Sequence, residues 1–168
     1  MTDASKRGFT LIELLVTLAV AAILLTVAVP NFQMFVVNNR MASQANDLIT
    51  AFNMARSEAV KRAANVMVCA GTSCTVAGSW TQGWIVADAA GNAIRVQQAL
   101  GGASTLTPGA DVASKITFTS NGRTTIPTTA TTASTTLTLC PPSPASVQGR
   151  AIQIERTGRT RVSAVACP

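Results

Sequence analysis

The sequence predicts an α+β fold in which one long N-terminal helix packs on an antiparallel β-sheet domain. Two observations predict it. Residues 9–29 contain 17 apolar residues out of 21 and a single charge, which is typical of a membrane helix. From residue 65 onward, threonine-rich and β-branched runs alternate with Gly, Asn and Pro, which is typical of short strands. We therefore divide the chain into a leader (1–8), a transmembrane helix (9–30), an amphipathic helix (31–64) and a β-rich exported domain (65–168).

The first helix is long enough to cross a bilayer. Twenty-one residues make about 30 Å of α-helix. Lys6 and Arg7 directly precede the apolar run, so the leader should stay in the cytoplasm while the rest of the chain is exported. A secretory signal and an ordinary single-pass anchor share this charge pattern. Neither a secretory signal nor a single-pass anchor requires an acidic residue such as Glu13 within its apolar run. Because an acid inside a membrane costs up to ~3 kcal/mol, Glu13 should have a partner and a role.

The helical pattern resumes after Pro30, which should kink the helix rather than end it. The next residues repeat apolar side chains at steps of three and four, which predicts one buried stripe on a helix reaching about residue 64. The members of this stripe are Met41, Ala45, Leu48, Phe52, Ala55, Ala59 and Ala63.

The exported domain is predicted to contain eight strands. We expect residues 124–138, which are mostly Thr and Ala without charge, to be a weakly structured edge or loop. Trp80 and Trp84 flank one strand, and packing against the sheet is a better expectation for them than ligand stacking. The expected strands are 66–69, 83–87, 94–99, 115–119, 123–126, 136–140, 150–155 and 159–164.

Four cysteines follow the apolar helix and should therefore reach an oxidising compartment. They allow three disulfide pairings. A zinc site is the alternative, but the spacing lacks two C-x2-C knuckles, and we expect no metal. Cys69 and Cys74 bracket a plausible turn, and a bond between Cys140 and Cys167 would fasten the C-terminal hairpin.

The composition argues against an enzyme. The chain has no His and no Tyr, and only 12% of its residues are charged. Most acid–base and triad chemistry is therefore excluded, and we expect no catalytic residue and no cofactor. The net charge of +6 favours an anionic partner such as nucleic acid or a membrane surface.

The positive charge concentrates near the C-terminus, where two segments, 116–126 and 152–162, share one pattern. A three-residue loop with Gly158 in the left-handed conformation pairs Ile152 with Val162 and Ile154 with Thr160. A two-residue turn would instead bury arginines, so the hydrophobic pattern selects the longer loop. The same choice pairs Ile116 with Ile126. The prediction is a solvent-facing cluster of Arg156, Arg159 and Arg161, with Arg123 or Arg150 close to it.

Residues 8–14, GFTLIEL, resemble the processing site of type IV prepilins and type II secretion pseudopilins. The resemblance implies cleavage between Gly8 and Phe9 by a prepilin peptidase and methylation of the new Phe9 amine. It also implies that Glu13 pairs with the N-terminal amine of a neighbouring subunit during assembly. The subunit would be a single-pass inner-membrane protein before it enters a filament with other pilins at the cell surface or in the periplasm. Such a buried pair would select the stagger between subunits rather than add much stability.

The rest of the chain resembles the minor pilins of the GspH/FimT/FimU group, through the spacing of Cys69 and Cys74, the Trp80–Trp84 segment and the late TGRTR (157–161). The fold implied is that of type IV pilins. In FimT-type members a GRxR segment is linked to DNA capture in natural transformation, and here it falls on residues 158–161. We therefore expect a FimT-like minor pilin that binds DNA through phosphate contacts, independently of sequence.

A structural minor pilin or type II pseudopilin is the alternative. In that case the arginines would pair with a neighbouring subunit or stay solvated, and the protein would prime filament assembly without binding DNA. No aromatic residues interleave with the arginines, so base stacking is not expected. The sequence does not distinguish a pilus from a pseudopilus.

Overall fold

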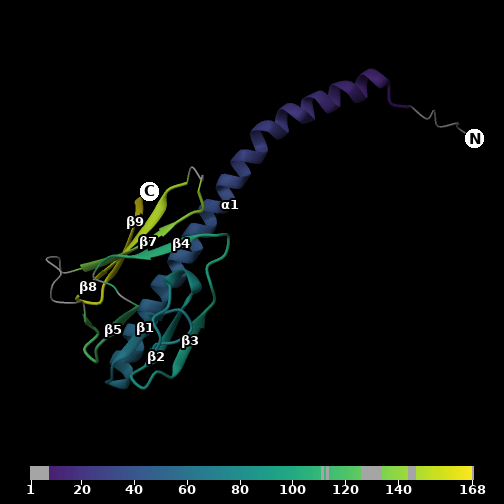
Figure 1. Cartoon of the computed structure of the whole chain (residues 1–168). Helices are drawn as coiled ribbons and strands as arrows, with labels where there is room; N and C mark the ends of the chain where they lie inside the picture. The colour runs from purple at the N-terminus through teal and green to yellow at the C-terminus, as the bar shows by residue number, and fades with distance from the viewer. Residues whose placement is uncertain (1–7, 111, 113, 126–133, 144–146, 168) are drawn as a thin grey trace, which may run out of the picture. The chain divides into compact units, whose positions relative to one another are not determined.

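The computed structural model describes residues 8–110, 112, 114–125, 134–143 and 147–167. The chain divides into two compact units, Met1–Val36 and Val37–Pro168. The predicted leader, apart from Gly8, lies outside the described residues. Figure 1 labels the long helix and most of the strands.

Helix α1 (Leu11–Arg62) begins in the first unit and continues through Pro30 into the second. Thr10 lies just before it, and its hydroxyl accepts a hydrogen bond from the Glu13 amide at 3.3 Å, which satisfies one free donor of the first turn. By length and composition α1 could cross a membrane, and its most apolar window is wholly exposed. The predicted membrane boundary at residue 30 stays a prediction.

The second half of α1 presents one apolar stripe to the core. The stripe confirms the prediction for six of its seven expected members; the seventh, Ala63, is exposed because α1 ends at Arg62. Ala63 has a φ of 49°, and the next amide, of Ala64, donates to the carbonyl of Ala59 at 3.2 Å. This is the bonding of a left-handed helix C-cap, normally a glycine position.

The strands form two antiparallel sheets. One sheet has the order β3-β2-β1-β5-β6 and the other the order β4-β7-β8-β9. The first sheet consists of β1 (Val66–Ala70), β2 (Trp84–Asp88), β3 (Ala93–Gln97), β5 (Lys115–Phe118) and β6 (Thr124–Thr125). The second consists of β4 (Thr105–Pro108), β7 (Ser134–Cys140), β8 (Gly149–Glu155) and β9 (Thr160–Val165), and a short 3-10 helix η1 (Trp80–Gln82) precedes β2.

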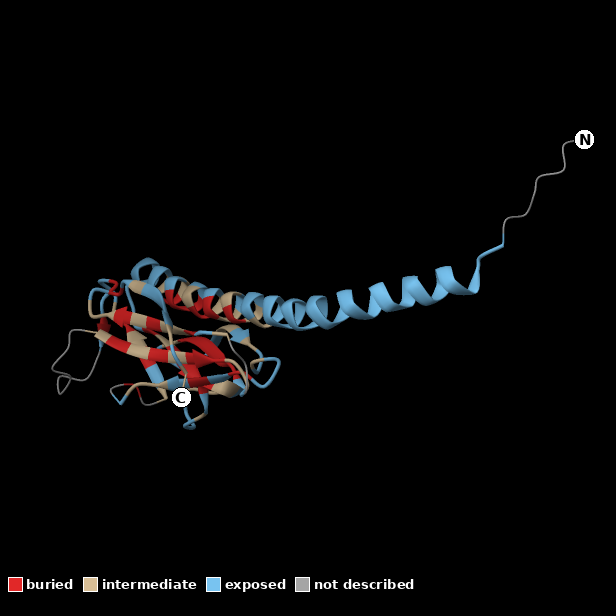
Figure 2. Ribbon diagram, turned by 90° about the horizontal axis from the view of Figure 1, so that it is seen from above, coloured by how far each residue is buried: buried red, intermediate tan, exposed pale blue. Residues whose placement is uncertain are grey.

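The main hydrophobic core joins the helix to both sheets. Phe52 of α1, Phe118 of β5 and Ile152 of β8 are all fully buried in it, and Figure 2 shows the buried residues gathered between the helix and the strands. Trp80 and Trp84 are 1% and 2% exposed, which confirms the expectation that they pack rather than stack on a ligand.

Two features of the strands differ from the prediction. Strand β4 was not expected. The expectation of a weakly structured edge or loop at 124–138 is wrong for 134–138, because these residues belong to β7 in the interior of the second sheet. Thr124–Thr125 form β6, an edge strand inside the expected strand 123–126. Thr135, Leu137 and Leu139 are buried, so alternate residues of β7 face the core. The threonines hid part of this alternation, since Thr135 is buried whereas Thr136 and Thr138 are only half-buried.

The cysteines form two disulfides, Cys69–Cys74 and Cys140–Cys167, the pairings preferred from the sequence. No free cysteine remains, and the described residues contain no group of side chains suited to a metal ion. The second disulfide passes over Gly149, where a β-carbon would overlap the Cys167 sulfur. It thereby ties the end of the chain to β7, two strands away from β9.

Candidate nucleic-acid interface

Two hairpin turns with the same geometry carry the predicted arginines. In one turn the Thr119 amide donates to the carbonyl of Arg123 at 2.8 Å, and the Gly122 amide donates back to Thr119 at 2.8 Å. In the other turn Glu155 and Arg159 are joined in the same way at 2.9 Å, and the Gly158 amide donates to Glu155 at 2.9 Å. Each turn therefore encloses three residues.

The glycine of each turn is required by its conformation. Gly122 and Gly158 have φ values of 75° and 76°, in the left-handed region that favours glycine. The following strands pair as predicted, with Ile152 opposite Val162 and Ile154 opposite Thr160. The register of the first hairpin also agrees, with Thr117 opposite Thr125; Ile126, the expected partner of Ile116, lies outside the described residues. The predicted three-residue loops are confirmed.

The two turns contact each other although they belong to different sheets. Thr124, directly after the first turn, donates its amide to the carbonyl of Arg156 at 3.0 Å and its hydroxyl to the carbonyl of Glu155 at 2.9 Å. A β-carbon at Gly158 would overlap the carbonyl oxygen of Gly122. We call this contact between Gly122, Thr124, Glu155, Arg156 and Gly158 the turn lock.

Helix α1 adds a third element to the same place. The Arg56 side chain lies beside both glycines, with its Nε 3.2 Å from where a β-carbon on either would stand. Arg56 also lines a shallow groove along α1, whose other members are Asn53, Ser57, Val60 and Lys61. The sequence reasoning missed Arg56, because its position off the apolar stripe is typical of an ordinary solvated residue.

The arginines of the predicted cluster have different surroundings. Arg123, Arg159 and Arg161 are exposed. Arg161 lies 3.5 Å from the Glu155 carboxylate, and among the described residues neither Arg123 nor Arg159 forms an ion pair. Arg156 is only half-exposed, and its Nε is buried without a hydrogen-bond partner in the described part of the chain. The expectation that Arg156 is solvent-facing is therefore only partly met.

Arg150 lies elsewhere. It stands near the opposite end of β8 from Glu155, about 17 Å away at the usual rise per residue. Its guanidinium donates to the Asn38 side-chain oxygen on α1 at 3.0 Å. The expectation that Arg150 joins the cluster is wrong, because a long-range partner holds it against the helix. We use the name arginine surface for Arg56, Arg123, Arg159 and Arg161.

Few acids oppose these cations. Glu155 is bound by Arg161 and also accepts from the Thr157 hydroxyl at 3.2 Å. On α1, Glu58 contacts Arg62 at 2.6 Å and Lys61 at 3.8 Å. The hydrogen bond from Arg62 lowers the pKa of the Glu58 carboxyl, so this acid is ionised and neutralises its own helix neighbours rather than the arginine surface.

Exposed, weakly compensated arginines suit phosphate oxygens, which a guanidinium can bind through two parallel hydrogen bonds. The exposed large aromatics of the described residues are Phe9, Phe32 and Phe35, all in the first unit. The arginine surface therefore has no aromatic platform for bases, and its chemistry fits a sugar–phosphate backbone rather than unstacked bases.

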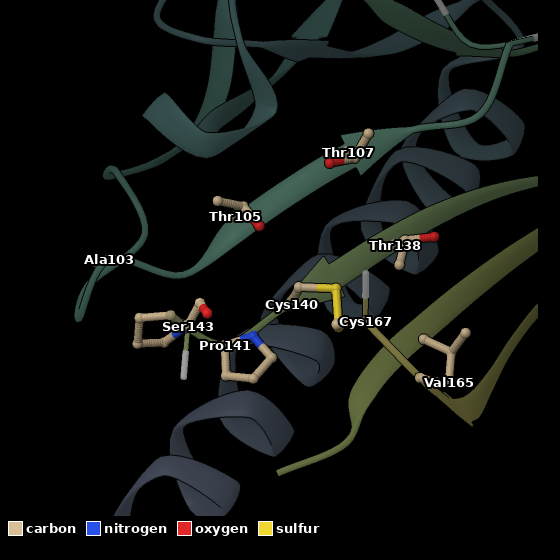
Figure 3. A pocket seen from close by; sticks show the side chains of 11 residues that line it. Ala103, Thr105, Thr107, Thr138, Cys140, Pro141, Ser143, Val165 and Cys167 are labelled. Carbon is tan, nitrogen blue, oxygen red and sulfur yellow. A yellow bond between two sulfur atoms is a disulfide. The ribbon is translucent and has the colours of Figure 1, made fainter. Parts of the chain in front are cut away.

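A separate cavity of about 640 Å³ lies beside the Cys140–Cys167 disulfide (Figure 3). Its walls include Thr105 and Thr107 of β4, Thr138 of β7, and Val165 at the end of β9. None of its lining residues is charged, so the cavity does not extend the arginine surface.

The predicted processing and assembly residues lie in the first unit. Gly8, Phe9 and Glu13 are exposed, and Phe9 is 78% exposed. Their roles stay predictions.

Comparison with protein families gave two matches. The model of "Type II transport protein GspH" matches residues 44–158, and that of the "Prokaryotic N-terminal methylation motif" matches residues 3–29. Comparison with curated proteins gave no match.

Solved structures of minor pilins share the fold. The type IV minor pilin FimU of Pseudomonas aeruginosa is 24% identical with a TM-score of 0.59, and the match covers 77% of this chain and 92% of that one. A second crystal form of FimU gives a TM-score of 0.55, also at 24% identity, and covers 73% and 91%. The minor pseudopilin EpsH from the type 2 secretion system of Vibrio cholerae is 14% identical with a TM-score of 0.56, covering 74% and 97%. The chain thus has the type IV pilin fold.

Proposed function

The chain belongs to the GspH family of type II transport proteins, and from this premise we propose that it is a FimT-like minor type IV pilin that binds extracellular DNA for natural transformation. The binding is independent of sequence and runs through the phosphates. In this role the protein is first a single-pass inner-membrane subunit and then part of a pilus at the cell surface.

The observation that carries the proposal is the convergence of arginines from three places in the sequence. Arg56 comes from α1, Arg123 from the first turn, and Arg159 and Arg161 from the second hairpin. Charged residues that are merely solvated need not lie close together, whereas residues that contact several phosphates of one DNA strand must. Each contact is weak, and several together give useful affinity.

Assembly uses the other end of the chain. Prepilin peptidase cleaves after Gly8, the new Phe9 amine is methylated, and Glu13 pairs with the terminal amine of a neighbouring pilin. The match of the N-terminal methylation motif to residues 3–29 supports this step. An acid and an amine neutralise each other in apolar surroundings only when subunits are in register.

The alternative function is that of a pseudopilin or structural minor pilin that primes assembly, and it is supported by the family match and by the shared fold of EpsH. There, the arginine surface would contact a neighbouring subunit. Pull-down of other minor pilins that depends on Arg159 and Arg161, without DNA binding, would favour this alternative.

The test is a titration of fluorescent duplex DNA with the full chain in a non-ionic detergent. Arg159→Gln/Arg161→Gln should weaken binding at least tenfold, since each charged hydrogen-bonding contact is worth roughly a factor of ten. The matched control is Arg95→Gln/Lys115→Gln, which removes the same charge from β3 and β5 and should bind within about twofold of the wild type. Equal affinities for the wild type and the Arg159/Arg161 variant would overturn the DNA proposal.

A further inference from the structure

The residues of the arginine surface carry like charges that repel one another. Other contacts within the protein must therefore keep them close together. Arg123 and Arg159 each directly follow the glycine of their turn, and the two glycines are stacked. Bringing cations together is unfavourable in the free protein and favourable only when an anion neutralises them. A contact that maintains this arrangement therefore indicates a function in binding.

The turn lock helps to fix the first turn. Among the described residues, β6 consists of Thr124 and Thr125, which pair with Phe118 and Thr117 of β5. In the described part of the chain β6 is the edge strand of its sheet and pairs with β5, so contacts outside the sheet matter for its position. Among the described residues, the hydrogen bonds from this hairpin to the second hairpin come from Thr124, which is only 7% exposed.

The second hairpin also needs support. Strand β9 is an edge strand that pairs with β8, and four of its six residues are exposed. Gly158 is buried against the first turn, and no side chain larger than hydrogen fits there, because the carbonyl oxygen of Gly122 occupies the space. Each turn is thus held partly by the other.

We propose that the turn lock sets the DNA affinity of the arginine surface, with Thr124 and Gly158 acting as positioning residues. This inference rests on the proposed function and deepens it. Arginines held in one arrangement before binding lose less conformational freedom on the phosphate backbone than arginines on two independent turns. The number of arginines alone therefore does not determine the affinity.

The direct test is Thr124→Val in the full chain in non-ionic detergent, titrated with duplex DNA. This variant removes the hydroxyl that donates to Glu155, keeps the amide bonded to Arg156, and leaves every charge in place. We expect about five- to tenfold weaker binding, because the free energy of one hydrogen bond no longer holds the arginines in the binding arrangement and must be supplied when DNA binds. Thr124→Ser should restore affinity, because serine keeps the donor. Thr105→Val, on the exposed face of β4, is the matched control and should bind like the wild type.

A second measurement does not depend on a variant folding. In amide NMR spectra of the wild-type chain, Gly122, Arg123, Gly158 and Arg159 should shift together during the DNA titration and fit one dissociation constant. Shifts confined to Gly158 and Arg159, or wild-type affinity in Thr124→Val, would overturn the positioning role while leaving the DNA proposal intact. A wild-type chain that binds no DNA would overturn the proposed function itself.

Discussion

Replacing Cys140 and Cys167 with serine should lower the free energy of unfolding of the second unit by about 3.6 kcal/mol. The estimate uses the sequence separation of 27 residues closed by this disulfide, since the loss of chain entropy in the unfolded state grows with the logarithm of loop length. The bond also ties down β9, an edge strand with one pairing partner.

The Cys69–Cys74 bond provides the internal comparison. It closes a separation of 5 residues, so Cys69→Ser/Cys74→Ser should cost only about 2.1 kcal/mol by the same relation. The two variants should therefore differ by about 1.5 kcal/mol, with the C-terminal variant less stable.

Urea unfolding of the full chain in non-ionic detergent, followed by tryptophan fluorescence, measures this difference. Trp80 and Trp84 are the only tryptophans of the sequence, and both are buried in the second unit, so the signal reports that unit and not the membrane helix. Equal losses in the two variants, or a larger loss in the Cys69/Cys74 variant, would refute the reasoning from loop length.

Three further predictions concern the helix cap, a turn and the filament. Ala63→Gly should raise the free energy of unfolding by about 1 kcal/mol, because Ala63 has a φ of 49° that glycine adopts without strain; a decrease in urea melts would contradict the cap assignment. The hydrogen bonds from Asn92 lower the pKa of Asp88, so the contribution of its carboxylate to folding stability is complete at neutral pH and is lost as the pH falls through that lowered pKa. The difference in free energy of unfolding between wild type and Asp88→Ala should therefore shrink between pH 7 and pH 3, and a difference that widens would exclude this role. Glu13→Gln should reduce the amount of this subunit in sheared filaments, measured by immunoblot against the cell-associated pool, and normal incorporation would reject pairing with a neighbouring amine.

Much of the fold follows from local patterns in the sequence. The apolar stripe of α1 predicted six residues that are buried, because the helical period directly reports which face meets the core. The register of the β8–β9 hairpin was predicted correctly, since only a three-residue loop keeps Ile152 and Ile154 on one face and the arginines off it.

Other features depend on contacts that no local pattern contains. Strand β4 exists through its pairing with β7, about 30 residues later, and its own sequence gives little signal. Arg150 was expected beside the other arginines because it is near them in sequence, but Asn38 of α1 binds it at the far end of β8. Arg56 joins the arginine surface only because two glycine turns from different sheets meet beside it. The glycine–arginine pattern that both turns share can be read from the sequence, but the contact between the two turns cannot.

The salt dependence of DNA binding tests phosphate recognition most directly. If all four members of the arginine surface contact phosphates, the logarithm of the association constant should fall with the logarithm of salt concentration with a slope of about −3.6. In Arg159→Gln/Arg161→Gln the slope should weaken by about 1.8, because two contacts are lost. Binding by the wild-type chain that does not change with salt, or the same slope in wild type and variant, would contradict the assignment of the arginine surface to DNA.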